Sequence, residues 1–139
     1  MRKIATLLAV ATAAVMLFAG SSAVSPSSAE AAACKWGMPS YARIVQGNNH
    51  TVDLTYNRTT GAWTAKAYNR GKLATTSTQV AFASFTPRLV KFVITWINDT
   101  AGIYTGTIDG DGFVDGTTRD RFNPSQKTSF YMSNRARCG

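Results

Sequence analysis

Residues 89–108, LVKFVITWINDTAGIYTGTI, carry the pattern that decides the fold. Apolar residues occupy every second position before the turn-forming segment DTAG, and the alternation resumes after it in IYTGTI. Successive side chains of a β-strand point to opposite faces, so the pattern predicts two antiparallel strands that bury one face. On the first strand, the face predicted to lie inside comprises Val90, Phe92, Ile94 and Trp96, and the outer face comprises Lys91, Val93, Thr95 and Ile97.

The same alternation recurs along the chain, with turn residues at about every tenth position, as all-β domains show. No amphipathic helical pattern is long enough to compete. The segment 69–77 is interpreted as a looser link between two strands. Both Pro87 and Pro124 fall between strands, where the missing amide donor of proline costs least. The strands predicted in this way cover residues 41–46, 51–57, 62–68, 78–85, 89–98, 103–108, 113–119 and 129–134.

Eight short strands with short links predict an all-β fold, a small antiparallel up-and-down β-barrel, with a two-sheet β-sandwich as the alternative. The small size of the domain favours a filled interior over a hollow one, which leaves the barrel mouth for a ligand. The residues expected to face water on the two strands after residue 50 are Asp53, Thr55, Thr64 and Lys66. Further residues expected to line the interior are Val52, Leu54, Tyr56, Trp63, Ala65, Ala67, Tyr104, Gly106 and Ile108.

The N-terminal residues 1–31 have the organisation of a secretory signal peptide. Arg2 and Lys3 precede an apolar run over residues 4–19, and a small, polar stretch with Ala-rich cleavage sites follows. The run is too short for a comfortable membrane span. We therefore expect a secreted protein whose single β-barrel domain covers residues 32–139.

Two cysteines, Cys34 and Cys138, lie near the two ends of this domain. In an exported protein such a pair most simply forms one disulfide. In an even-stranded barrel the first strand begins where the last one finishes, so the bridge would lock the closing seam. Closing a loop of about a hundred residues stabilises a fold by roughly 4 to 5 kcal/mol in the chain-entropy treatment. The alternative is that AAAC is a lipobox and that Cys34 is acylated.

The mature domain is strongly basic. The whole chain carries a net charge of +8, and removal of Arg2, Lys3 and Glu30 leaves +7, with no Glu. The positive residues are scattered, which indicates a generally cationic surface with a loose attraction to anionic envelope components or polysaccharides. No nucleic-acid-binding module is recognisable, so no specific nucleic-acid partner is expected. We expect a monomer.

Two hairpins, TVDLTYNRTTGAWTAKAY (residues 51–68) and FVITWINDTAGIYTGTI (residues 92–108), resemble those of avidin-type barrels, an architecture close to that of lipocalins. The second has a strand ending in Trp, followed by an aromatic-x-Gly strand. The resemblance implies that Trp96 and Tyr104 contact a ligand. Trp63 and Tyr56, from the same predicted interior set, complete the candidate site.

The resemblance does not extend to biotin as the ligand. Avidins place polar groups soon after their first Trp, whereas Trp36 is followed by Gly37, Met38 and Pro39, and no Trp follows Trp96. The chain also resembles, in general texture, small exported proteins of actinobacteria, which implies no known activity.

The acidic segment TIDGDGFVDGTT (residues 107–118) matches the middle of a calcium-binding EF-hand loop through Asp109, Asp111 and Asp115. Its ends do not match, because Thr107 and Thr118 stand where the first Asp and the closing Glu belong. Asp-Gly pairs also favour tight hairpin turns. We interpret the segment as a hairpin and predict neither a metal site nor a cofactor.

No catalytic motif is present. His50, the sole histidine, lies in a predicted turn, and no G-x-S-x-G motif appears. Asp120, between Arg119 and Arg121, is the most ambiguous carboxylate, and we interpret it as part of a structural salt bridge. A cluster of Asp120, Arg119 and an aromatic residue in an open cleft would favour an enzyme.

Three classes of function therefore remain. The first is a secreted, non-enzymatic binding module for a small molecule or glycan at the barrel mouth. The second is a cationic effector or inhibitor that acts on another macromolecule or on the cell envelope. The third is an enzyme, which the absence of catalytic motifs disfavours. The concentration of Trp and Tyr on predicted inward faces favours the binding module.

Overall fold

The computed structural model describes residues 35–86 and 88–139. The predicted signal peptide and Cys34 lie outside these residues. Within them the chain is all-β, and no helix is long and apolar enough to span a membrane.

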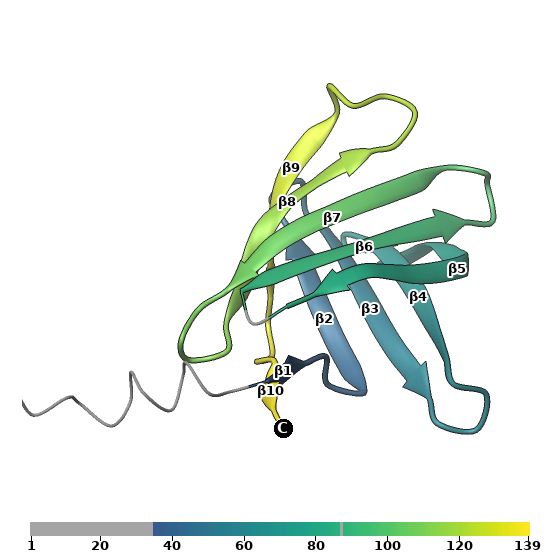
Figure 1. Cartoon of the computed structure of the whole chain (residues 1–139). Coiled ribbons are helices and arrows are strands. Elements are labelled where there is room, and N and C mark those ends of the chain that lie inside the picture. The colour runs from purple at the N-terminus through teal and green to yellow at the C-terminus, as the bar shows by residue number, and fades with distance from the viewer. Residues whose placement is uncertain (1–34, 87) are drawn as a thin grey trace, which may run out of the picture.

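Eight antiparallel strands close into one barrel, in which each strand pairs with its neighbours in sequence and the last pairs with the first (Figure 1). This arrangement confirms the predicted up-and-down barrel and excludes the alternative of a two-sheet β-sandwich. The barrel strands are β2 (Tyr41–Gln46), β3 (His50–Asn57), β4 (Ala62–Asn69), β5 (Lys72–Phe85), β6 (Leu89–Trp96), β7 (Ala101–Ile108), β8 (Val114–Asp120) and β9 (Lys127–Met132).

Strand β5 is longer than the sequence pattern predicted. The segment 69–77 is not a loose link, because β5 already begins at Lys72 and runs for 14 residues. Arg70 and Gly71 both have positive φ, 49° and 79°, as the two central residues of the tight hairpin turn that matches strand twist require. The pairing of β5 with β6 is interrupted by two register shifts, which bend a long strand around a small barrel.

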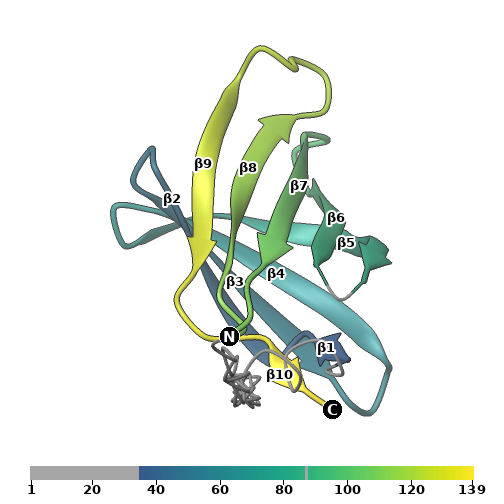
Figure 2. The same ribbon diagram turned by 60° about the vertical axis from the view of Figure 1, so that its left-hand side comes forward.

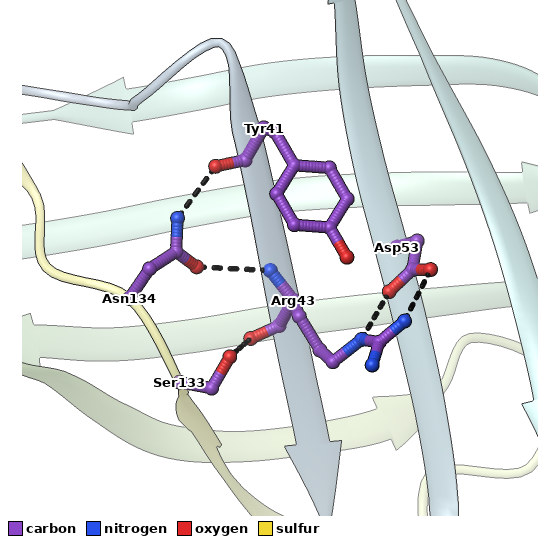
Figure 3. A network of polar contacts seen from close by, with 5 residues as sticks. All are labelled: Tyr41, Arg43, Asp53, Ser133 and Asn134. Atoms are coloured by element: carbon purple, nitrogen blue, oxygen red, sulfur yellow. Dashed lines mark hydrogen bonds and ion pairs between the residues drawn. The ribbon is translucent and has the colours of Figure 1, made fainter.

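The seam between β2 and β9 has three paired positions, Ile44 with Met132, Val45 with Tyr131 and Gln46 with Phe130. Residues after β9 extend it (Figure 3). The Asn134 side chain accepts a hydrogen bond from the Arg43 backbone N–H at 3.0 Å and donates one to the Tyr41 carbonyl. The Ser133 N–H donates to the Arg43 carbonyl at 2.8 Å.

Arg43 and Asp53, on the outer surface of β2 and β3, are joined by two hydrogen bonds of 2.7 and 2.9 Å (Figure 3). These bonds lower the pKa of the Asp53 carboxyl. The ion pair links two paired strands directly across from each other, since Arg43 and Asp53 are register partners.

A second, two-stranded sheet joins the ends of the domain. Strand β1 (Trp36–Gly37) pairs with β10 (Arg137–Cys138), and the Gly139 N–H donates to the Lys35 carbonyl at 3.1 Å (Figure 2). We call this sheet the terminal clasp. It brings Cys138 beside residues 35 and 36, as a bridge to Cys34 requires. Because Cys34 lies outside the described residues, the disulfide stays a prediction.

The middle of the barrel is filled by residues that the alternation pattern placed inside, together with others that it did not name, such as Ile44, Phe82 and Phe130. Val90, Phe92 and Ile94 are completely buried, as are Ile44 and Leu54. A chain of aromatic rings crosses this interior, with neighbouring centroids 4.8 to 5.6 Å apart, in the order Tyr56, Trp63, Phe82, Phe92, Tyr104 and Phe130. Such spacing is favourable for aromatic pairs. Two pockets lie at the ends of the barrel, on either side of this filled middle.

Candidate functional site: pockets at the two ends of the barrel

The structure divides the four predicted ligand-binding residues between two pockets. Trp96 and Tyr104 line a pocket at the end formed by the β2–β3, β4–β5, β6–β7 and β8–β9 turns, which we call the mouth pocket. Tyr56 and Trp63 line a pocket at the opposite end, beside the terminal clasp, which we call the clasp pocket. The filled interior lies between them, so the four residues do not form one site.

The mouth pocket has a volume of about 660 Å³ and a polar floor. The Gln46 amide donates a hydrogen bond to the Tyr104 hydroxyl at 2.9 Å, and the buried Thr118 hydroxyl lies in the same lining. Tyr104 and Trp96 are only 2% and 7% exposed. Both rings therefore offer little area to a ligand, and the polar groups at the base of the pocket are the Gln46 amide and the Thr118 and Tyr104 hydroxyls.

Burial dominates the electrostatics of Tyr104. Removal from water raises the pKa of its hydroxyl to about 12, although hydrogen bonds with Thr118 and Gln46 offset part of the rise. The group therefore stays protonated at physiological pH. It serves as a neutral hydrogen-bonding group at the base of the pocket.

The rim of the mouth pocket carries polar and charged residues from several strands and turns. His50 and Asn48 come from the β2–β3 hairpin, Arg119 and Asp120 from the end of β8, and Lys127 from the start of β9. Every second turn of an up-and-down barrel lies at the same end, which explains why residues distant in sequence share this rim.

Asp120 shares the pocket lining with Arg119 and Trp96, the combination that would favour an enzyme. Its side chain has a structural task, however. Asp120 Oδ1 accepts hydrogen bonds from the Phe122 and Asn123 backbone N–H groups at 2.7 and 2.8 Å, which shape the β8–β9 loop. Asp120 forms no ion pair with any residue of 35–86 or 88–139, so the predicted salt bridge is wrong.

The clasp pocket, of about 570 Å³, has a different character. Three aromatic side chains, Tyr56, Trp63 and Phe82, form one wall, and each is half-buried. Met38 contributes further apolar surface. Two cationic side chains, Arg58 and Arg137, complete the lining.

The acidic segment is a hairpin, as predicted. Asp109 Oδ1 accepts hydrogen bonds from the Asp111 and Phe113 N–H groups, both at 2.9 Å, and Gly112 adopts a positive φ of 84°. Asp115 lies within β8, opposite Thr107 and Tyr131. The three aspartates thus do not converge, and no group of three metal-ligating side chains occurs among the residues that the structure describes.

Sequence reasoning missed Gln46 and Thr118, although both follow the alternation pattern. Gln46 continues the inward face of Ala42 and Ile44, and Thr118 continues that of Val114 and Gly116. A polar residue among the last inward positions of a strand is the signal that would have found them, because the interior opens there.

Comparison with known proteins adds no functional information. No protein-family model matches the chain. No curated protein and no solved structure matches it either.

Proposed function

We propose that this protein is an exported, non-enzymatic binding module that takes a small polar molecule or the end of a glycan in its mouth pocket. The observation that carries the proposal is the Gln46–Tyr104 hydrogen bond at the floor of a 660 Å³ pocket. The pocket falls in the size range of small-molecule sites, which combine apolar walls with a few placed polar groups.

The lining favours a neutral, hydroxyl-bearing ligand. Amide and hydroxyl groups from Gln46, Thr118 and Tyr104 can donate and accept hydrogen bonds at the floor. The rim contains both signs of charge, Arg119 and Lys127 beside Asp120, so it does not select one ionic class. Export through residues 1–31, action as a monomer and a loose attraction to anionic envelope components belong to the same proposal.

A direct test is a binding screen of the purified domain. A panel of mono- and disaccharides and small polar metabolites is tested by heteronuclear NMR, and any hit is titrated against Tyr104→Phe and Gln46→Ala. Each substitution removes one neutral hydrogen-bonding partner, so affinity should fall about 3- to 10-fold. Lys91→Gln, on the outer face of β6, is the control and should bind as the wild type does.

An unchanged affinity in both floor variants would place the site elsewhere. The cationic outer surface, as expected for an effector that acts on another macromolecule, would then be the better candidate.

A further inference from the structure

The clasp pocket combines an aromatic wall with unpaired positive charge. The Tyr56 and Trp63 rings lie 5.2 Å apart at 44°, and the Trp63 and Phe82 rings lie 5.3 Å apart at 56°. These side chains come from β3, β4 and β5, so the wall is built on paired strands. Because all three are only half-buried, they leave apolar ring surface open to the pocket.

The two arginines of this pocket come from different elements. Arg58 follows β3 in the turn to β4, and Arg137 belongs to β10 of the terminal clasp. Both are exposed, and neither forms an ion pair with another residue of the described ranges. None of the lining residues in the described part of the chain carries a carboxylate. The guanidinium groups are therefore available to an external anion.

These features specify a ligand class. A flat aromatic ring can pack on the Trp63 and Phe82 faces in offset or tilted geometry. A carboxylate or sulfonate on the same molecule can accept paired hydrogen bonds from a guanidinium fork. A cation would be repelled, and an uncharged ring would leave the arginines without partners.

We propose that the clasp pocket is a second binding site, separate from the mouth pocket, for a planar aromatic anion. The filled barrel interior separates the two ends, so the sites can be tested independently. The proposal does not rest on the function of the mouth pocket.

The test uses 2-naphthalenesulfonate and its uncharged analogue 2-naphthalenesulfonamide as probes of the oxidised domain. Calorimetric titration measures affinity, and heteronuclear NMR locates the probe. We expect the sulfonate to shift the Trp63 indole resonance, and to bind at least about tenfold more tightly than the sulfonamide, because charge-assisted hydrogen bonds are the stronger kind.

Two double variants are compared. The first carries Arg58→Gln and Arg137→Gln. The second, the control, carries Arg70→Gln and Arg121→Gln and so loses two exposed arginines at the opposite end of the barrel. The first pair should weaken sulfonate binding about tenfold or more and leave sulfonamide binding unchanged, whereas the second pair should leave both unchanged. Far-ultraviolet circular dichroism checks that both variants are folded.

Three results would overturn the proposal. These are no sulfonate binding at millimolar concentration, equal losses in the two double variants, or probe-induced shifts centred on Trp96 and Tyr104. The last would assign the anion to the mouth pocket.

Discussion

Tyr104 illustrates how one residue serves both fold and site. Its ring stacks on Phe92, with centroids 4.8 Å apart and an angle of 4° between planes, so it closes the filled part of the barrel. Its hydroxyl accepts the Gln46 hydrogen bond and faces the mouth pocket. A phenylalanine at this position would keep the ring packing and lose the hydrogen bond with Gln46.

Tyr104→Phe should therefore keep the fold and change the alkaline stability profile. The folded-state pKa of about 12 exceeds the ordinary value near 10, so the unfolded chain loses this proton first. Below pH 10 the hydroxyl is protonated in both states, and the free energy of unfolding does not depend on this group's titration. As the pH rises from 10 to 12, the free energy of unfolding falls by about 2 to 3 kcal/mol, because the buried hydroxyl resists the ionisation that the unfolded chain undergoes.

The measurement is urea unfolding at pH 8, 10, 11 and 12 for both proteins. At pH 8 the variant should be less stable by about 1 kcal/mol, because one hydrogen bond is missing. Between pH 10 and 12 the difference should shrink or reverse. Parallel pH profiles would contradict the assigned burial of the hydroxyl.

At the scale of the element, the seam between β2 and β9 is the shortest part of the barrel ladder. Three register pairs connect these strands, compared with eight between β3 and β4. Asn134 lengthens the seam, because its amide bonds the Arg43 N–H and the Tyr41 carbonyl in place of a paired strand (Figure 3). The Asn134 side chain thus satisfies two backbone groups of β2 that no strand partner satisfies at this end of the seam.

Asn134→Ala should destabilise the domain by about 1 to 2 kcal/mol in urea unfolding, because two backbone groups lose their partners. Asn48→Ala is the matched control, since among the described residues the Asn48 side chain bonds only the His50 N–H, two residues away, in an exposed turn. The Asn48→Ala control should lower the free energy of unfolding by clearly less. Equal losses would show that Asn134 contributes nothing particular to closure.

At the scale of the whole molecule, the two ends of the barrel differ in chemistry. The mouth end presents amides, hydroxyls and both signs of charge, whereas the clasp end presents aromatic rings and two arginines. The terminal clasp forms part of one of these ends, because Arg137 belongs to β10, Met38 directly follows β1, and both residues line the clasp pocket. Both ends of the described domain therefore contribute residues to a proposed site.

The predicted Cys34–Cys138 bridge would hold this clasp together. A Cys34→Ser, Cys138→Ser double variant should lose roughly 4 kcal/mol in the chain-entropy treatment, a decrease in Tm on the order of 10 to 20 °C for a domain of this size. Calorimetry on the mature oxidised protein and the variant makes the comparison. Equal melting temperatures, or a lipid adduct on Cys34 by mass spectrometry, would refute the bridge.

The sequence alone determined most of the strand content and the inward face of the strands, because alternation is a local property that each strand displays by itself. Val90, Phe92 and Ile94 were placed correctly for this reason, and so was the hairpin at Asp109. The sequence left the barrel and the sandwich as alternatives, since closure depends on the long-range pairing of β2 with β9. The start of β5 was misplaced, since a turn with Arg70 at positive φ carries a weak residue signal.

Only the tertiary structure decided how the candidate residues group. Tyr56 and Tyr104 share the inward face but lie near opposite ends, because position along the barrel axis depends on strand register and direction, which alternation does not encode. Long-range pairing likewise brings Arg137 of the terminal clasp and Arg58 into the lining of one pocket. Local pattern specifies which face a side chain takes, and long-range pairing specifies which residues it meets.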